Sequence, residues 1–89
     1  MFHYGDGEEL YWDQRHGEVR FVVPGERATL LCRIEAGALE KEGARGDDAA
    51  SCLAAAQRCF EHITRRISDK LALGLTEPDG SVLVRARDW

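Results

Sequence analysis

The sequence has no long hydrophobic run. No stretch of its 89 residues approaches the roughly 18 apolar residues of a membrane-spanning helix, and its start lacks a basic segment followed by an apolar one. It also lacks a Gly-rich phosphate loop and a Gly-x-Ser-x-Gly elbow. We therefore expect a cytoplasmic protein with no membrane contact, and we find no signal for nucleotide binding or serine hydrolysis.

Cysteines are few, and their spacing does not suit a disulfide scaffold. Cys52 and Cys59 lie on one predicted helix, separated by roughly 10.5 Å along its axis, so they can neither bridge each other nor share a zinc ion. With Cys32 they make an odd number, which is typical of a reducing compartment. We expect each thiol to be a small buried hydrophobic group rather than a nucleophile.

A basic excess is also missing. The net charge is −4: residues 1–50 carry 11 acidic and 6 basic side chains, and residues 51–89 carry 5 acidic and 6 basic ones. Proteins that bind nucleic acids gain most of their affinity by neutralising phosphates, so a nucleic-acid partner is not expected. The histidines His3, His16 and His62 are far apart and lack metal-ligand spacing, so we predict no metal and no other cofactor.

The composition is that of an ordinary globular domain. The hydrophobic share is 44% and the charged share is 31%, which is too apolar for a disordered chain. A chain of 89 residues forms one domain, 1–89, with a single core.

Alternation of apolar and polar residues predicts strands in the first third of the chain. Residues 10–12 and 18–23, joined by a polar loop, predict a β-hairpin. A Pro24-Gly25 turn leads to a third strand, 28–35, whose Cys32 faces the core. A fourth strand, 81–86, follows the turn at 77–80, and it could pair at either edge of the sheet.

Helical periodicity dominates the middle of the chain. A short helix is expected over 36–42, ended by Gly43. A long amphipathic helix is expected over 48–73, capped by Asp47 or Asp48 and ended by Gly74. Its apolar side chains recur at an average spacing of 3.6 residues, and they are Leu53, Ala56, Phe60, Ile63, Ile67 and Leu71.

These elements predict an α+β two-layer sandwich. The order is strand, strand, strand, helix, helix, strand, and we expect a small antiparallel sheet covered by the one long helix.

Short motifs along the whole chain resemble those of a small bacterial family, the domain-of-unknown-function family DUF1488. They are Trp12-Asp13, Val19-Arg20-Phe21, the strand with Cys32, Leu39, Arg58-Cys59-Phe60-Glu61 and the segment 77–82. The resemblance implies a compact bacterial α+β domain with no assigned activity and no catalytic residue to carry over. Such domains favour a serine helix cap where this chain has Glu35.

The polar face of the long helix is the first candidate interaction surface. Arg58, His62, Arg65 and Asp69 are expected on that face, with Arg66 nearby. We call the basic residues among them, Arg58, His62, Arg65 and Arg66, the basic band. An ordinary solvated face explains this pattern, with Glu61 and Arg65 as an i, i+4 pair, and contact with an anionic partner is the functional alternative.

Two further features point to protein contacts. Four of the seven aromatic residues lie among the first twelve, and they either pack an edge strand or form an interface: Phe2, Tyr4, Tyr11 and Trp12. Small residues at 52, 55, 56 and 59 form a ridge that the helix at 36–42 or a second copy could cover, so a homodimer is one expectation.

The function itself stays a hypothesis at this stage. We expect a non-catalytic interaction or accessory module with an unknown protein partner. The alternative is a small enzyme or small-molecule binder whose site forms at an oligomer interface, with His62 and either Glu61 or Asp69 as acid and base.

Overall fold

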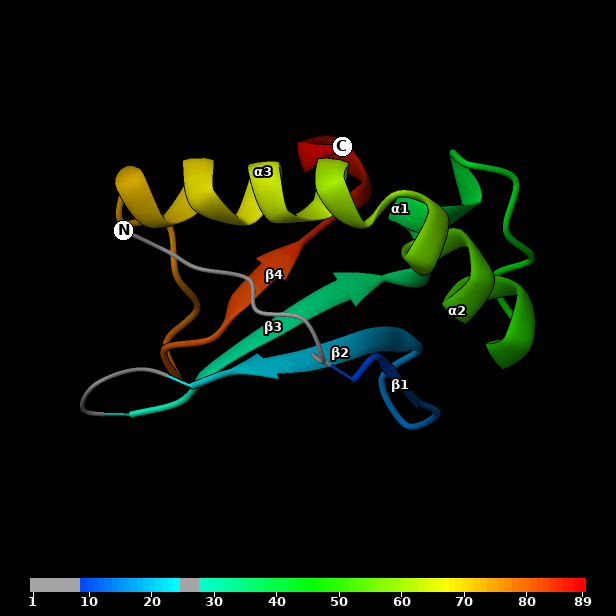
Figure 1. Ribbon diagram of the computed structural model, residues 1–89, viewed down its shortest axis with the longest axis horizontal. Coiled ribbons are helices and arrows are strands. Elements are labelled where there is room, and N and C mark those ends of the chain that lie inside the picture. Colours follow the sequence, from blue (N-terminus) through cyan, green and yellow to red (C-terminus); the bar gives the residue numbers. More distant parts are fainter. Residues whose placement is uncertain (1–8, 25–27) are drawn as a thin grey trace.

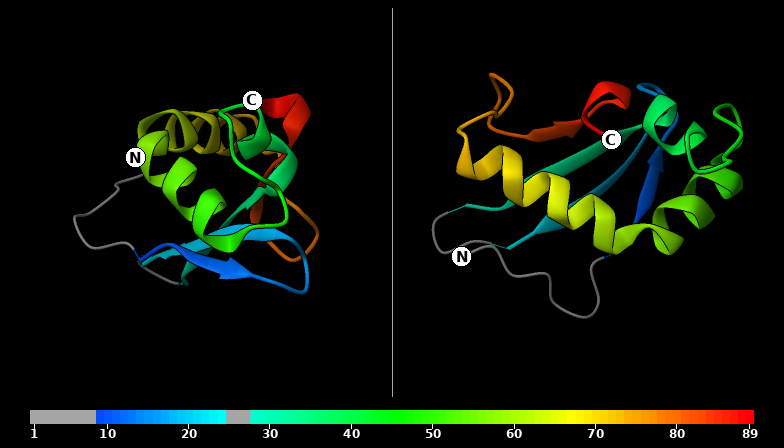
Figure 2. Two further views of the ribbon diagram at one scale, coloured as in Figure 1. Left: turned by 90° about the vertical axis from the view of Figure 1, so that its right-hand side faces the viewer. Right: turned by 90° about the horizontal axis from the view of Figure 1, so that it is seen from above.

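The computed structural model describes residues 9–24 and 28–89. Four strands form one sheet in the order β1-β2-β3-β4, and the helices lie together on one side of it (Figure 1). The elements in chain order are β1 Tyr11–Asp13, β2 Glu18–Val23, β3 Leu30–Glu35, α1 Ala36–Glu40, α2 Ala49–Arg58, α3 Phe60–Ala72, β4 Val82–Val84 and the 3-10 turn η1 Ala86–Asp88. The two layers are clear in the end view (Figure 2), so the predicted α+β sandwich is confirmed.

The predicted hairpin forms because its loop satisfies its own backbone groups. The Asp13 side chain accepts hydrogen bonds from the backbone N–H groups of Arg15 and His16, at 2.9 and 3.2 Å. Gly17 has a φ of 65°, which glycine adopts without strain. The two strands then pair antiparallel with Trp12 opposite Val19.

The fourth strand corrects one prediction. β4 pairs with β3 in parallel, with Arg33 opposite Leu83, so the sheet is mixed rather than antiparallel. The three helices lie between β3 and β4 in the chain and carry it back to the end of the sheet where β3 begins. A crossover of this kind makes its two strands parallel, whereas a tight turn makes them antiparallel.

The long helix is present with a bend. It is divided at Cys59 (φ −105°, ψ 17°) into α2 and α3, which run in different directions in Figure 1. Hydrogen bonds continue through the bend, since the Cys59 N–H donates to Ala55 O and Cys59 O accepts from the Ile63 N–H. The start is capped as predicted, because the Asp48 carboxylate accepts from the N–H groups of Ala50 and Ser51.

The core lies between the helices and the sheet. Ile63 and Ile67 of α3 are fully buried, and the Phe60 ring packs against that of Phe21 on β2, with centroids 5.2 Å apart. The other fully buried large side chains are Val19, Cys32, Ile34, Leu39, Cys52, Val82 and Val84. The predicted apolar side of the helix therefore covers the sheet as expected.

The last residues are held beside α3 (Figure 2). The Lys70 ammonium donates to Leu83 O at 2.8 Å and to the Asp88 carboxylate at 2.7 Å. Within the described residues, the Glu35 side chain makes no capping hydrogen bond at the start of α1. Its carboxylate instead accepts a hydrogen bond from the Ala86 N–H at 2.8 Å. In the part of the chain that the structure describes, no helix has the length and apolar character to cross a bilayer.

Candidate functional site

Three of the four residues of the basic band line one hollow. Arg58, at the end of α2, and His62 and Arg65, on α3, border an open hollow of about 360 Å³ together with Glu42, Cys59 and Glu61. The bend at Cys59 places the last turn of α2 beside the first turns of α3. The hollow lies at this bend, which the periodic pattern did not reveal.

Arg66, the fourth member, does not line this hollow. Its guanidinium lies 3.2 Å from the Asp69 carboxylate, and its buried Nε has no hydrogen-bond partner among the described residues. The basic band is thus three residues around a hollow and one residue beside it.

His62 is held by the end of the described chain. Its Nε2 lies 2.9 Å from the carbonyl oxygen of Trp89, and the two rings meet edge to face with centroids 4.5 Å apart. The Trp89 indole N–H donates to the Glu42 carboxylate at 2.9 Å. Within residues 9–24 and 28–89, His62 makes no hydrogen bond to Glu61 or Asp69, so proton transfer between them would require the contacts of His62 to rearrange.

The charges on this side of the helix alternate in sign. The Arg65 guanidinium lies 3.9 Å from the Glu61 carboxylate, and these two side chains are 61% and 92% exposed. Arg58 donates to the backbone oxygen of Glu42 at 3.2 Å. At such exposures an ion pair contributes about 0 to 1 kcal/mol, so these groups stay available to a partner.

The thiols are unsuited to nucleophilic chemistry in this arrangement. Burial and the nearby Glu42 carboxylate raise the pKa of the Cys59 thiol, against the smaller opposing effect of Arg58. Burial, together with Asp48 and other acidic neighbours, also raises the pKa of Cys52, whose Sγ donates to Arg45 O. Cys32 is fully buried, as predicted from its place on the strand.

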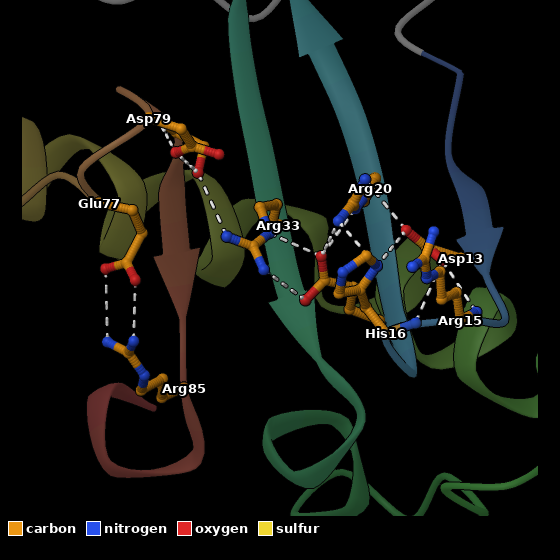
Figure 3. Close-up of polar contacts among 10 residues, drawn as sticks. Asp13, Arg15, His16, Arg20, Arg33, Glu77, Asp79 and Arg85 are labelled. Atoms are coloured by element: carbon orange, nitrogen blue, oxygen red, sulfur yellow. Dashed lines mark hydrogen bonds and ion pairs between the residues drawn. The ribbon is translucent and has the colours of Figure 1, made fainter.

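A second charged surface covers the face of the sheet opposite the helices (Figure 3). At its centre the Glu18 side chain, only 4% exposed, accepts from Arg20 of β2 and Arg33 of β3 at 2.6 Å each. These two arginines stand directly opposite each other in the strand register. Glu18 therefore separates two like charges that would otherwise repel.

The same layer extends to both edges of the sheet. Arg20 also contacts Asp13 at 3.0 Å, and Arg33 reaches the Ser81 hydroxyl at 3.3 Å. At the edge of the sheet formed by β4, the Arg85 guanidinium forms an ion pair with the Glu77 carboxylate at 2.9 Å. The alternation along residues 18–23 places Glu18 and Arg20 on one face, but the contact of Glu18 with Arg33, 15 residues later, depends on the fold.

Asp13, His16 and Glu18 offer ligand atoms within 4.8 Å of one another. Arg20 already occupies this place with its positive guanidinium, 3.0 Å from Asp13, 2.6 Å from Glu18 and 3.4 Å from the His16 ring. Hydrogen bonds and charge from His16 and Arg20 outweigh desolvation by burial and lower the pKa of Asp13. The arginine satisfies these carboxylates in the way that a metal ion would.

The remaining predicted contact surfaces are only partly described. Tyr11 on the edge strand β1 is 44% exposed, whereas Trp12 packs against the core. Phe2, His3 and Tyr4 lie outside the described residues. On the ridge of small residues, Cys52, Ala55 and Ala56 are buried and Cys59 is partly exposed, with α1 packed against α2.

Comparison with known proteins bears on the fold. No protein-family model matches the chain, and no curated protein matches its sequence. Its fold matches the crystal structure of a protein of unknown function from the DUF1488 family of Shewanella loihica PV-4, with a TM-score of 0.77 and 18% identity. The match covers 88% of this chain and 87% of that one. The chain thus has the fold of a DUF1488 family protein, as the sequence motifs indicated.

Proposed function

We propose that this domain is a non-catalytic interaction module of the bacterial cytosol that contacts a protein partner through the exposed charged side of α3. The observation that carries this proposal is the contrast between the two charged surfaces. On the sheet, charges are joined by short contacts and are largely shielded, as for Glu18. On α3, Arg65 and Glu61 are more than half exposed and their guanidinium and carboxylate lie 3.9 Å apart.

Exposed charge with little internal pairing is suited to recognition. Desolvated ion pairs on the sheet contribute to the fold, and a partner would have to break them to bind there. Charges at a rim or on an open helix face steer association and select the partner. The open hollow beside Arg58, His62 and Arg65 gives this surface a shape as well as a charge pattern.

The state of the reactive groups supports a non-catalytic role. The His62 Nε2 is engaged by Trp89 O, and burial raises the pKa of the Cys59 thiol, which keeps it protonated. Cys52 and Cys59 are not in a disulfide within the described residues, which supports a reducing compartment such as the cytosol as the location.

A small-molecule site near His62 is the second candidate. It is favoured by the volume of the hollow, about 360 Å³, which lies at the lower end of the range of roughly 300 to 1,000 Å³ found for ligand sites. A site of this kind would gain enclosure from a second protein chain. Saturation-transfer NMR with a metabolite mixture separates the candidates: signals that disappear on changing His62→Ala would favour the small-molecule site.

The main test is affinity capture from lysate of the native organism. We expect the double variant Arg58→Glu, Arg65→Glu to lose a partner that the wild-type protein recovers. The matched control is Arg15→Glu, Arg87→Glu, which makes the same change in charge at exposed arginines elsewhere. Equal recovery by all three proteins, each with a native circular-dichroism spectrum, would refute the proposal.

A further inference from the structure

Four charged residues follow one another on the exposed side of the bent helix: Arg58 at the end of α2, and Glu61, Arg65 and Asp69 on α3. We call Arg58, Glu61, Arg65 and Asp69 the charged stripe. Arg58, Glu61 and Arg65 line one hollow, and the exposed fractions of the Arg65 and Asp69 side chains are 61% and 57%. In the right-hand view of Figure 2, no other drawn helix or strand crosses over α3.

The order of charges along this stripe is positive, negative, positive, negative. Read from the other end, it becomes negative, positive, negative, positive. A second copy of α3 laid antiparallel would therefore place Glu61 opposite Arg65 of that copy, and it would bring Asp69 of that copy toward Arg58, which ends α2 just before the bend. Both pairs centre on nearly the same point of the helix, between Glu61 and Arg65, so one two-fold axis satisfies them together.

We propose that the partner of this surface is a second copy of the chain, docked antiparallel through the charged stripe. This inference rests on the proposed function and names its partner. A parallel arrangement is disfavoured because it would bring like charges together at every position. An antiparallel copy gives each stripe residue an opposite charge.

The contacts within the chain leave room for such pairing. Glu61 is 92% exposed and Arg58 donates only to a backbone oxygen among its described hydrogen bonds. Asp69 lies 3.2 Å from Arg66, which would remain beside the new pair. Leu73, 72% exposed just after α3, adds apolar surface at the end of the helix.

An interface built mainly from exposed charge is specific but weak. Pairs of this kind are screened by salt, with a Debye length of about 8 Å at physiological ionic strength. We therefore expect a dimer with a dissociation constant of roughly 0.1 to 1 mM, which weakens further as salt is raised.

Two charge reversals test the pairing, since the two-fold axis makes each change act twice. Glu61→Arg places two positive residues opposite each other at these positions, and Arg65→Glu places two negative ones. Each variant alone should dimerise about tenfold or more weakly than the wild type. An equimolar mixture should regain the dimer mass, because the positive variant then faces the negative one. Sedimentation equilibrium gives these masses, and Arg15→Glu is the control that should dimerise normally.

Several outcomes overturn the inference. They are a wild-type protein that stays monomeric from about 1 μM to about 1 mM, single variants that dimerise as well as the wild type, or a mixture that stays monomeric. If the protein is monomeric while lysate capture still depends on Arg58 and Arg65, the second copy is wrong and the interaction module stands. If neither mass nor capture responds to these residues, both proposals fail.

Discussion

Changing Glu18→Gln should destabilise the fold more than any other substitution in the charged layer of the sheet. The side chain is 4% exposed, and its carboxylate contacts Arg20 and Arg33 at 2.6 Å each. The variant keeps the shape of the side chain and removes its charge. Two guanidinium groups, 17% and 16% exposed, would then face each other across adjacent strands without an anion between them.

The size of the effect follows from the exposure of the groups. Each pair at a charge separation of about 4 Å is worth roughly 4 kcal/mol at an effective dielectric constant of about 20, before the cost of desolvation. Removing one partner of a buried pair costs about 3 to 5 kcal/mol, and the partial exposure of both arginines reduces this. We expect a loss of about 2 to 4 kcal/mol. With an m-value of about 1 kcal/mol/M, the urea midpoint should fall by about 2 M or more.

Glu77→Gln is the matched control, since it makes the same change on the same face. Within residues 9–24 and 28–89, Glu77 forms an ion pair with Arg85 only, and their side chains are 22% and 32% exposed, so we expect a loss of less than about 1 kcal/mol. The double variant Glu18→Gln, Arg33→Met should recover part of the stability, because it removes one of the two unpaired cations. Equal midpoints for Glu18→Gln and Glu77→Gln would show that the central carboxylate does not hold the layer together.

Three further predictions concern the helices and the last strand. Phe60→Ala should lower the free energy of unfolding by about 2 to 4 kcal/mol in urea titration, because it removes the ring that packs on Phe21; a loss below about 1 kcal/mol would contradict this packing. Asp48→Ala should cost about 1 kcal/mol by the same assay, whereas Asp48→Asn, which can still cap, should cost clearly less. Burial opposes ionisation of Asp88, but hydrogen bonds from the Lys70 ammonium and the Arg85 N–H lower its pKa below 3.8. Its stabilising contribution is therefore present above about pH 4 and lost as the pH falls below that value, so thermal melts of Asp88→Asn should show a shallower loss of stability on acidification than the wild type.

The sequence predicted those structural elements whose formation depends on interactions between residues close together in the chain. The hairpin depends on Asp13 and Gly17, and the start of α2 depends on Asp48, all of which act on neighbouring residues. The apolar spacing on the helix identified Ile63 and Ile67 as core residues because burial follows the helical period. In each of these cases, the controlling interactions lie within a few residues of one another.

The features that were not predicted depend on distant contacts. The bend at Cys59 is invisible in the pattern, since both helical segments present apolar residues to the core. The parallel pairing of β4 depends on where the crossover returns the chain. The burial of Lys70 is a further example, since its contacts are with Leu83 and Asp88, which come 13 and 18 residues later.

The candidate site was predicted in part for the same reason. Helical spacing places Arg58, His62 and Arg65 on one side, and the structure brings them to one hollow. Two distant residues also lie in this region: Glu42, which follows α1, and Trp89, which contacts both Glu42 and His62. No local sequence pattern connects either residue with His62. The alternation of Glu61 and Asp69 with the arginines was visible in the sequence, and its significance emerged only with the exposed fractions.

The most direct test of the central claim is an NMR dilution series of the wild-type protein. If the exposed side of α3 is the contact surface, the amide signals of residues 58–69 should shift with concentration while those of the β1–β2 hairpin stay fixed. Raising the salt concentration should shift the α3 signals toward their dilute positions. Concentration-dependent shifts confined to the hairpin and the charged face of the sheet would contradict the account, as would spectra that do not change across the series.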